Sequence, residues 1–253
     1  MRGDADIAKI GSLVADPARA RILLALGDGR ALPASVLAEE AGVAASTASA
    51  HLAKLVDGGL LTVQSHGRHR YFALAGEAVG ELIEALARLA PAAPVRSLRQ
   101  GTKAQALRVA RTCYDHLAGG LGTGLMGAMI DRELLAGGDG EFHLERARRD
   151  RLSAPGFDLD YRLTDRGVAT LDSFGIDFET LAAQQRPLIR YCVDWSEQRH
   201  HLAGSLGAAL ADRMFELGWV NRRRGSRAVR ISDEGRDGLA ETFGLELAGA
   251  EAG

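Results

Sequence analysis

The stretch from residue 36 to residue 61 constrains the fold most, because its small and apolar residues are spaced as in two short helices joined by a tight turn. Ala38 is small where the two helices would cross, and Gly42 permits the turn between them. Leu52 and Leu55 would bury the inner side of the second helix. This pattern is typical of a helix-turn-helix, whose second helix enters the major groove of duplex DNA.

Further elements are expected on both sides of this unit. Asp16 and Pro17 predict the start of a helix, since aspartate caps helices and proline favours their first position. Residues 60–64 and 70–74 are expected to form two strands around a glycine-containing turn, which would be the wing of a winged helix. Apolar spacing predicts helices over residues 4–14, 17–26, 32–41, 45–56 and 77–89.

The side of the second helix that faces away from the expected core carries polar groups suited to nucleic acid. Short hydroxyl groups and one cation can reach base edges and phosphates, and basic side chains on the hairpin can straddle the DNA backbone. We predict DNA contacts by Ser46, Thr47, Ser49, His51, Lys54, Arg68, His69 and Arg70. In a competing interpretation, Ser46 only caps its helix and His51 lies at the edge of the helix.

Together with the run Asp16-Pro17-Ala18-Arg19, this region resembles the ArsR family of bacterial repressors over residues 5–88. The resemblance implies a homodimer joined through the first and last helices of the domain. It also implies binding to an operator with two-fold symmetry, and release of that operator when an effector binds. The side chains expected at or near the dimer seam are Ile7, Ile10, Leu82 and Leu86.

The sequence departs from the metal-sensing members of that family. In those members, the resemblance implies cysteine pairs in the second helix of the motif, or aspartate and histidine sets in the last helix. Residues 36–57 contain no cysteine, and residues 77–89 contain no histidine. Any sensing is therefore expected in the C-terminal extension, which the resemblance does not cover.

Length and net charge limit the number of domains and the way in which the chain can bind DNA. A chain of 253 residues is expected to fold as two domains, and the prolines at 91 and 94 mark a break between them. The formal net charge of −2 means that DNA binding must depend on the local placement of basic groups. The expected division is a DNA-binding and dimerisation domain over 1–90, a linker over 91–104 and an effector-binding domain over 105–253.

The environment of the protein is also constrained. No apolar run approaches the ~20 residues that cross a bilayer, and no signal segment is recognisable, so we expect a cytoplasmic protein without membrane contact. Only Cys113 and Cys192 carry thiols, and disulfide bonds are not expected in a reducing compartment.

The second domain contains a weak internal duplication. The sequence of residues 111–115 is similar to that of residues 190–194. Residues 161–167 are likewise similar to residues 229–235, and each of these two segments precedes an amphipathic helix that ends in Phe-Gly. The copies are expected over about 105–182 and 185–249. The fold class is therefore mainly α with small β wings (α+β): a winged helix-turn-helix plus a duplicated helix–hairpin–helix C-terminal domain.

Three kinds of effector site are compatible with this duplicated domain, and the cofactor is left open. The first is an organic ligand in a cleft between the copies, which we favour because pockets combine apolar walls with a few polar groups. Its expected lining is Tyr114, Met126, Tyr191, Trp195 and Met214, with polar groups from His116 and His201.

The second kind of site is a metal centre. Cys113 and His116 are three residues apart, as on one helix face, and Cys192, His200 and His201 occupy the matching part of the second copy. Two thiols with two or three imidazoles can supply a tetrahedral site for zinc or a related ion. The third kind is a thiol redox pair of the two cysteines, although lone helical cysteines often only pack as small hydrophobes.

Other functions are weighed against sensing. Basic runs near the predicted hairpins could touch phosphate, or they could simply be solvated turns. They comprise Arg146, Arg148, Arg149, Arg151, Arg222, Arg223, Arg224 and Arg227. No phosphate-binding or hydrolase motif is recognisable, and Asp194, Glu197 and His201 lack a second anchoring motif, so we do not expect an enzyme. A C-terminal domain that docks another protein remains the alternative of another class.

Overall fold

A computed structural model describes residues 4–66, 69–91, 97–143, 159–223 and 226–247. The chain forms two compact units. The N-terminal unit spans residues 1–86 together with 224–227, and the C-terminal unit spans residues 87–223 together with 228–253. Among the described residues, no helix is both long and apolar enough to span a membrane.

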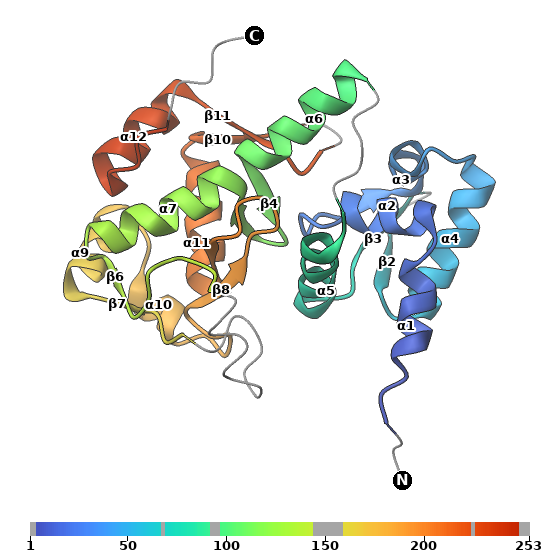
Figure 1. The fold of residues 1–253 in the computed structure, drawn as a ribbon, viewed down its shortest axis with the longest axis horizontal. Coiled ribbons are helices and arrows are strands. Elements are labelled where there is room, and N and C mark those ends of the chain that lie inside the picture. The colour runs from blue at the N-terminus through green and yellow to red at the C-terminus, as the bar shows by residue number, and fades with distance from the viewer. Residues whose placement is uncertain (1–3, 67–68, 92–96, 144–158, 224–225, 248–253) are drawn as a thin grey trace. The chain divides into compact units, whose positions relative to one another are not determined.

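The N-terminal unit is a winged helix-turn-helix, as predicted (Figure 1). Its three strands form one antiparallel sheet in the order β1-β3-β2, and β2 with β3 make the wing. The elements are α1 (Ile7–Val14), α2 (Pro17–Ala25), β1 (Leu32–Pro33), α3 (Ala34–Ala41), α4 (Ala45–Asp57), β2 (Leu61–His66), β3 (His69–Leu74) and α5 (Glu77–Leu89).

Local chemistry explains where these helices begin and end. Asp16 caps α2 by accepting from the backbone N–H groups of Ala18 and Arg19, and Pro17 occupies the first turn. Gly42 ends α3 with φ of 68°, a left-handed conformation that glycine adopts without strain. Leu52 is buried on the inner side of α4. These features confirm the helix boundaries expected from the sequence to within a few residues.

The C-terminal unit alternates two-stranded hairpins with helices (Figure 1). Its first half contains α6 (Leu98–Val109), β4 (Arg111–Cys113), β5 (His116–Ala118), α7 (Gly119–Asp131), β6 (Leu135–Ala136), β7 (Arg162–Leu163), α9 (Asp165–Ser173) and α10 (Phe178–Ala182). Its second half contains β8 (Arg190–Val193), β9 (His200–Ala203), α11 (Gly204–Glu216), β10 (Val220–Arg222), β11 (Val229–Ile231) and α12 (Asp233–Phe243).

Helices α7 and α11 pack reciprocally in the core of this unit. A methyl group on Gly122 of α7 would lie 3.4 Å from Cβ of His201, and one on Gly207 of α11 would lie 3.2 Å from Cβ of His116. Each helix therefore lies close to the hairpin of the other half. Met126 and Met214, one on each helix, are fully buried among the apolar core side chains.

Two expectations for the C-terminal unit are corrected. Residues 98–104, predicted as linker, belong to α6, because the segment is rich in residues that tolerate a helix; residues 92–96 lie outside the described part. Cys113 and His116 do not share a helix face but lie on β4 and β5. A spacing of three residues fits a helix face, and it also places two residues opposite each other across a two-residue hairpin turn.

Candidate DNA-contacting surface and Cys–His cluster

Helix α4 presents most of the predicted DNA-contacting side chains to solvent. Ser46, Thr47, Ser49 and Lys54 are exposed, whereas Ala48 and Leu52 face the core. The Ser49 hydroxyl donates to the Ala45 carbonyl within the helix, so its remaining capacity is as an acceptor. The residue that caps α4 is Ala44, so Ser46 is not the cap.

His51 differs from the other predicted contacts. Its side chain is mostly buried, and Nδ1 lies 3.8 Å from Oδ1 of Asp16 at the start of α2. The ring therefore contacts the start of α2 and lies at the edge of the exposed face of α4. His51 packs against the neighbouring helix, and its contact with DNA stays a prediction.

The wing contributes one described basic side chain, that of Arg70. It is exposed on β3, with its guanidinium carbon 5.9 Å from the centroid of the Phe72 ring. Arg68 lies outside the described residues, and the side chain of His69 is not described.

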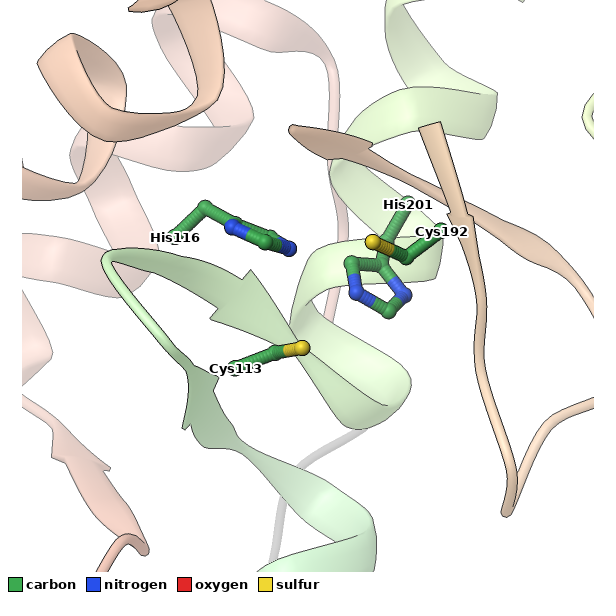
Figure 2. A group of neighbouring side chains, drawn as sticks. All are labelled: Cys113, His116, Cys192 and His201. Carbon is green, nitrogen blue, oxygen red and sulfur yellow. The ribbon is translucent and has the colours of Figure 1, made fainter. Parts of the chain in front are cut away.

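Four side chains of the C-terminal unit converge on one point, and we name them the Cys–His cluster: Cys113, His116, Cys192 and His201. One ligand atom from each lies within 4.8 Å of the others. Figure 2 shows the four side chains pointing toward a common centre from two hairpins. Cys113, His116 and His201 are buried, and Cys192 is partly exposed.

The hairpin registers explain why these four residues meet. Cys113 is directly opposite His116 in the β4–β5 hairpin, and Cys192 is directly opposite His201 in the β8–β9 hairpin. Directly opposite residues project from the same face of an antiparallel pair. Each hairpin thus delivers one thiol and one imidazole, and the packing of the two hairpins brings both pairs together.

His200 is not part of the cluster, which corrects its assignment as a candidate ligand. Its Nδ1 lies 2.9 Å from the Tyr161 hydroxyl, and its ring centroid lies 4.2 Å from that of Tyr191. Successive residues of a strand point to opposite faces, so His200 and His201 cannot both face the same centre. The sequence places the two histidines side by side and does not distinguish them.

The expected organic-ligand cleft is also not formed by the residues named for it. Met126, Met214 and Tyr191 are core side chains, and Trp195 packs against the guanidinium of Arg111, 4.7 Å from the ring centroid. Tyr114 is a hairpin-turn residue with φ of 56°. A cavity of about 10 Å³, room for about one water molecule, lies between α7 and α11.

A separate groove of about 380 Å³ lies elsewhere in the C-terminal unit. Its lining includes Arg108, Arg236 and Glu197, together with the apolar side chains of Val109 and Ile231. The volume lies within the range of small-molecule sites. None of the side chains predicted for the organic-ligand cleft lines it.

The first histidine of the cluster has an aspartate and an arginine behind it. Nδ1 of His116 lies 3.2 Å from Oδ1 of Asp115, and the same carboxylate pairs with Arg186. Burial alone would lower the pKa of His116, but the Cys113 thiolate and a hydrogen bond to Asp115 outweigh burial and raise this pKa to about 9. Burial raises the pKa of Asp115, whereas hydrogen bonds to His116 and Arg186 lower it to about 2.

The second histidine also has an aspartate and an arginine behind it, but its Nδ1 makes no hydrogen bond among the described residues. Nδ1 of His201 lies 3.4 Å from Oδ2 of Asp194, which accepts from Nη2 of Arg111 at 2.9 Å and from the backbone N–H of Gly119 at 2.7 Å. Burial favours the uncharged form of Asp194, but the charge of Arg111 outweighs it and holds the pKa of this carboxyl below its usual range. Burial and the nearby His116 hold the pKa of His201 well below its ordinary value.

Asp115 and Arg186, which lie behind His116, were not among the residues singled out from the sequence. A usable signal existed, because an aspartate follows each cysteine by two residues, at Asp115 and Asp194. Arg186 carries no such signal, since its contact with Asp115 spans 71 residues.

The arginine runs near the predicted hairpins of the C-terminal domain supply fewer candidate phosphate contacts than expected, among the residues that are described. Arg222 and Arg223 are exposed, but Arg227 is buried and pairs with Glu84 of the N-terminal unit at 2.8 Å. Arg227 is therefore neither a phosphate contact nor a solvated turn residue, because its charge is neutralised inside the fold. Arg146, Arg148, Arg149, Arg151 and Arg224 lie outside the described residues.

Comparisons with known proteins agree with the fold of the N-terminal unit. A family model described as a helix-turn-helix domain matches residues 14–64. An uncharacterized HTH-type transcriptional regulator, YdfF of Bacillus subtilis, is 40% identical over 242 residues, covering 96% of this chain and 99% of the relative. The HTH-type transcriptional regulator CmtR of Mycobacterium bovis is 40% identical over 82 residues, covering 31% of this chain and 69% of that relative.

Solved structures give matches of similar extent. The NMR structure of the cadmium metal-sensor CmtR from Mycobacterium tuberculosis is 35% identical and covers 36% of this chain and 99% of its own, with a TM-score of 0.27. The homodimeric winged helix-turn-helix domain Mb0332 from Mycobacterium bovis is 31% identical and covers 35% of this chain and 88% of its own, with a TM-score of 0.29.

Proposed function

Because the chain belongs to the HTH-type transcriptional regulators, with a winged helix-turn-helix of the ArsR type, we propose that it binds its operator as a homodimer. We also propose that the Cys–His cluster controls this binding. The observation that carries the proposal is the convergence of two thiols and two imidazoles in the domain that follows the DNA-binding unit. The ArsR resemblance supports a repressor that releases DNA when its effector binds.

The exposed face of α4 supports the mode of DNA binding. Ser46 and Thr47 are short hydroxyl side chains near the start of the helix, where recognition helices contact base edges. Lys54 and Arg70 are exposed cations that suit phosphate groups beside the groove. Base contacts would give sequence preference, and phosphate contacts would give most of the affinity.

Apolar side chains left exposed on α1 and α5 support the dimer. Ile7 is 78% exposed and Leu86 is 40% exposed, and both belong to the seam expected from the sequence. A second copy would bury them and would place two recognition helices on the two halves of one operator. One helix alone reads too few base pairs for useful specificity.

The repeated order of elements in the C-terminal unit supports sensing by the cluster. Each half of the C-terminal unit supplies a hairpin, a long helix, a second hairpin and a further helix in the same order, which favours a gene duplication. The cluster joins the first hairpins of both halves, so an effector bound there would hold the halves together. An effector changes DNA affinity only if it binds the free and DNA-bound proteins unequally.

A small organic anion is the second candidate effector, supported by the groove that contains Arg108 and Arg236. Guanidinium groups suit carboxylate or phosphate ligands. An anion in the groove would depend on Arg108 and Arg236, whereas the first candidate depends on the Cys–His cluster.

Operator binding by the 253-residue chain tests these proposals. The operator is first selected from random or genomic duplexes, and its affinity is then compared with and without Zn²⁺ and with a chelator. We expect the response to disappear in Cys113→Ser/Cys192→Ser, while basal DNA binding persists.

A different result would assign sensing to the groove. In that case only carboxylate or phosphate metabolites would release the operator, and this response would be lost in Arg108→Ala/Arg236→Ala but kept in the cysteine variant. Stable capture of a protein partner, with no small-molecule response, would contradict both.

A further inference from the structure

We propose that Cys113, His116, Cys192 and His201 hold a single divalent cation of the zinc class, Zn²⁺ or its heavier relative Cd²⁺, in a closed tetrahedral site. The ligands would be the two sulfur atoms and Nε2 of each histidine. This inference concerns the cluster on which the proposed function rests, and it adds the identity of the ligand and the manner of its binding.

The positions of the ligand atoms fit this coordination. One sulfur or ring nitrogen from each of the four residues lies within 4.8 Å of the others, whereas the edges of a tetrahedron with zinc–sulfur and zinc–nitrogen bonds measure about 3.3–3.8 Å. Small side-chain rotations therefore close the site. The backbone needs no rearrangement, because each thiol and imidazole already stand opposite each other in a hairpin.

The histidine nitrogens provide an independent observation. Nε2 of His116 and Nε2 of His201 are buried and have no hydrogen-bond partner among the described residues. Buried polar atoms in native proteins are almost always satisfied by protein, water or an ion. Both rings belong to the cluster, so one cation at its centre would satisfy two otherwise unsatisfied atoms.

The aspartates assign which nitrogen binds the metal. Nδ1 of His116 lies 3.2 Å from Oδ1 of Asp115 and is hydrogen-bonded to it. Nδ1 of His201 lies 3.4 Å from Oδ2 of Asp194, close to this carboxylate but without a hydrogen bond to it. Histidine ligands usually donate their second N–H to a carboxylate or carbonyl, which fixes the ring and leaves the other nitrogen free for the metal. This arrangement is present at His116, and at His201 a carboxylate lies beside the same ring nitrogen, so Nε2 is the nitrogen left for the metal in both rings.

The donor set selects the class of ion. Two thiolates neutralise the charge of a divalent cation, and soft sulfur ligands disfavour Mg²⁺ and Ca²⁺, which prefer oxygen. Four protein ligands leave no open coordination position for a substrate, which is the arrangement of structural or regulatory zinc sites. The bound ion would therefore cross-link the β4–β5 and β8–β9 hairpins.

Cobalt substitution of the metal-depleted 253-residue chain tests the site without DNA. Titration with Co²⁺ is expected to give thiolate-to-cobalt charge-transfer bands and the visible bands of tetrahedral Co²⁺, saturating at one ion per chain. Zn²⁺ should displace the cobalt and abolish these bands. Octahedral spectra, or the absence of cobalt bands under reducing conditions, would overturn the proposal.

Variants locate the bound ion. Cys192→Ser and His116→Ala should each lose the tetrahedral spectrum, and His143→Ala, which removes an exposed histidine of the same unit, should keep it. Asp115→Asn should keep the spectrum but lower the affinity for Co²⁺ about 10- to 100-fold, since Asp115 positions a ligand without being one. Unchanged binding in the cysteine variant would place the metal elsewhere and refute the assignment.

A variant that fails to fold does not remove the test. In the wild-type protein, Zn²⁺ should slow alkylation of both thiols and raise the melting temperature, and Mg²⁺ should do neither. Failure of these effects counts against the metal site itself. Zinc binding with unaltered operator affinity would instead support the site and count against the proposed sensing.

Discussion

Nη2 of Arg111 lies 2.9 Å from Oδ2 of Asp194, and neither side chain is exposed to solvent. The two residues are 83 positions apart and come from the two halves of the C-terminal unit. The same carboxylate faces Nδ1 of His201, so this ion pair connects the core of the unit to the Cys–His cluster.

Removal of one partner of this pair should destabilise the C-terminal unit strongly. Arg111→Met leaves the Asp194 charge buried and uncompensated, and we expect a loss of about 3–5 kcal/mol in the free energy of unfolding. Urea denaturation followed by circular dichroism measures the effect. Arg166→Met, at an exposed position of α9, serves as the matched control and should change stability by about 0.5 kcal/mol or less. Equal stability of the two variants would contradict the role of the pair.

Gly122 should not tolerate a side chain. A Cβ atom there would lie 2.3 Å from the carbonyl oxygen of Leu117, a backbone atom that cannot move aside freely. We expect Gly122→Ala to cost about 1–3 kcal/mol of stability. Gly127→Ala, on the same helix, meets only the flexible end of Arg199 and should be neutral or stabilise by up to about 1 kcal/mol. Thermal or urea unfolding of both variants distinguishes a steric effect from helix propensity.

Substitutions on α4 and the wing should separate affinity from specificity. Lys54→Ala and Arg70→Ala should weaken binding to all duplexes and reduce the slope of log affinity against log salt by about 1 each. Thr47→Ala should change the preferred sequence instead. Gel shifts across operator variants and salt concentrations provide the measurement, with Lys103→Ala of the C-terminal unit as control. Wild-type affinity in Lys54→Ala/Arg70→Ala would remove these two assignments.

A charge at the expected dimer seam should produce monomers. Ile7→Glu places a carboxylate where a second copy would bury an apolar side chain, and burial of an unpaired charge is costly. Sedimentation at micromolar concentration should show the monomer mass for this variant and the dimer mass for the wild type. Leu217→Glu, at a partly exposed apolar position of the C-terminal unit, should remain dimeric. A dimeric Ile7→Glu variant would move the seam away from α1.

Much of the N-terminal unit followed from the sequence, because its signals are local. The Asp16-Pro17 cap, the turn at Gly42 and the apolar spacing over Glu77–Leu89 each act within a few residues, and the structure confirms the elements that they predicted. The assignment of individual side chains to DNA stays a prediction, because DNA contacts depend on a partner that the sequence does not describe.

The Cys–His cluster needed the tertiary structure. The sequence identified the two cysteines and three candidate histidines, but the three-residue spacing of Cys113 and His116 fits both a helix and a hairpin, and only long-range packing selects between them. The choice of His201 over His200 depends on which strand face turns inward. The sequence alone therefore determined which chemical groups are available, whereas strand register and the packing of two hairpins far apart in the chain decided which of them meet.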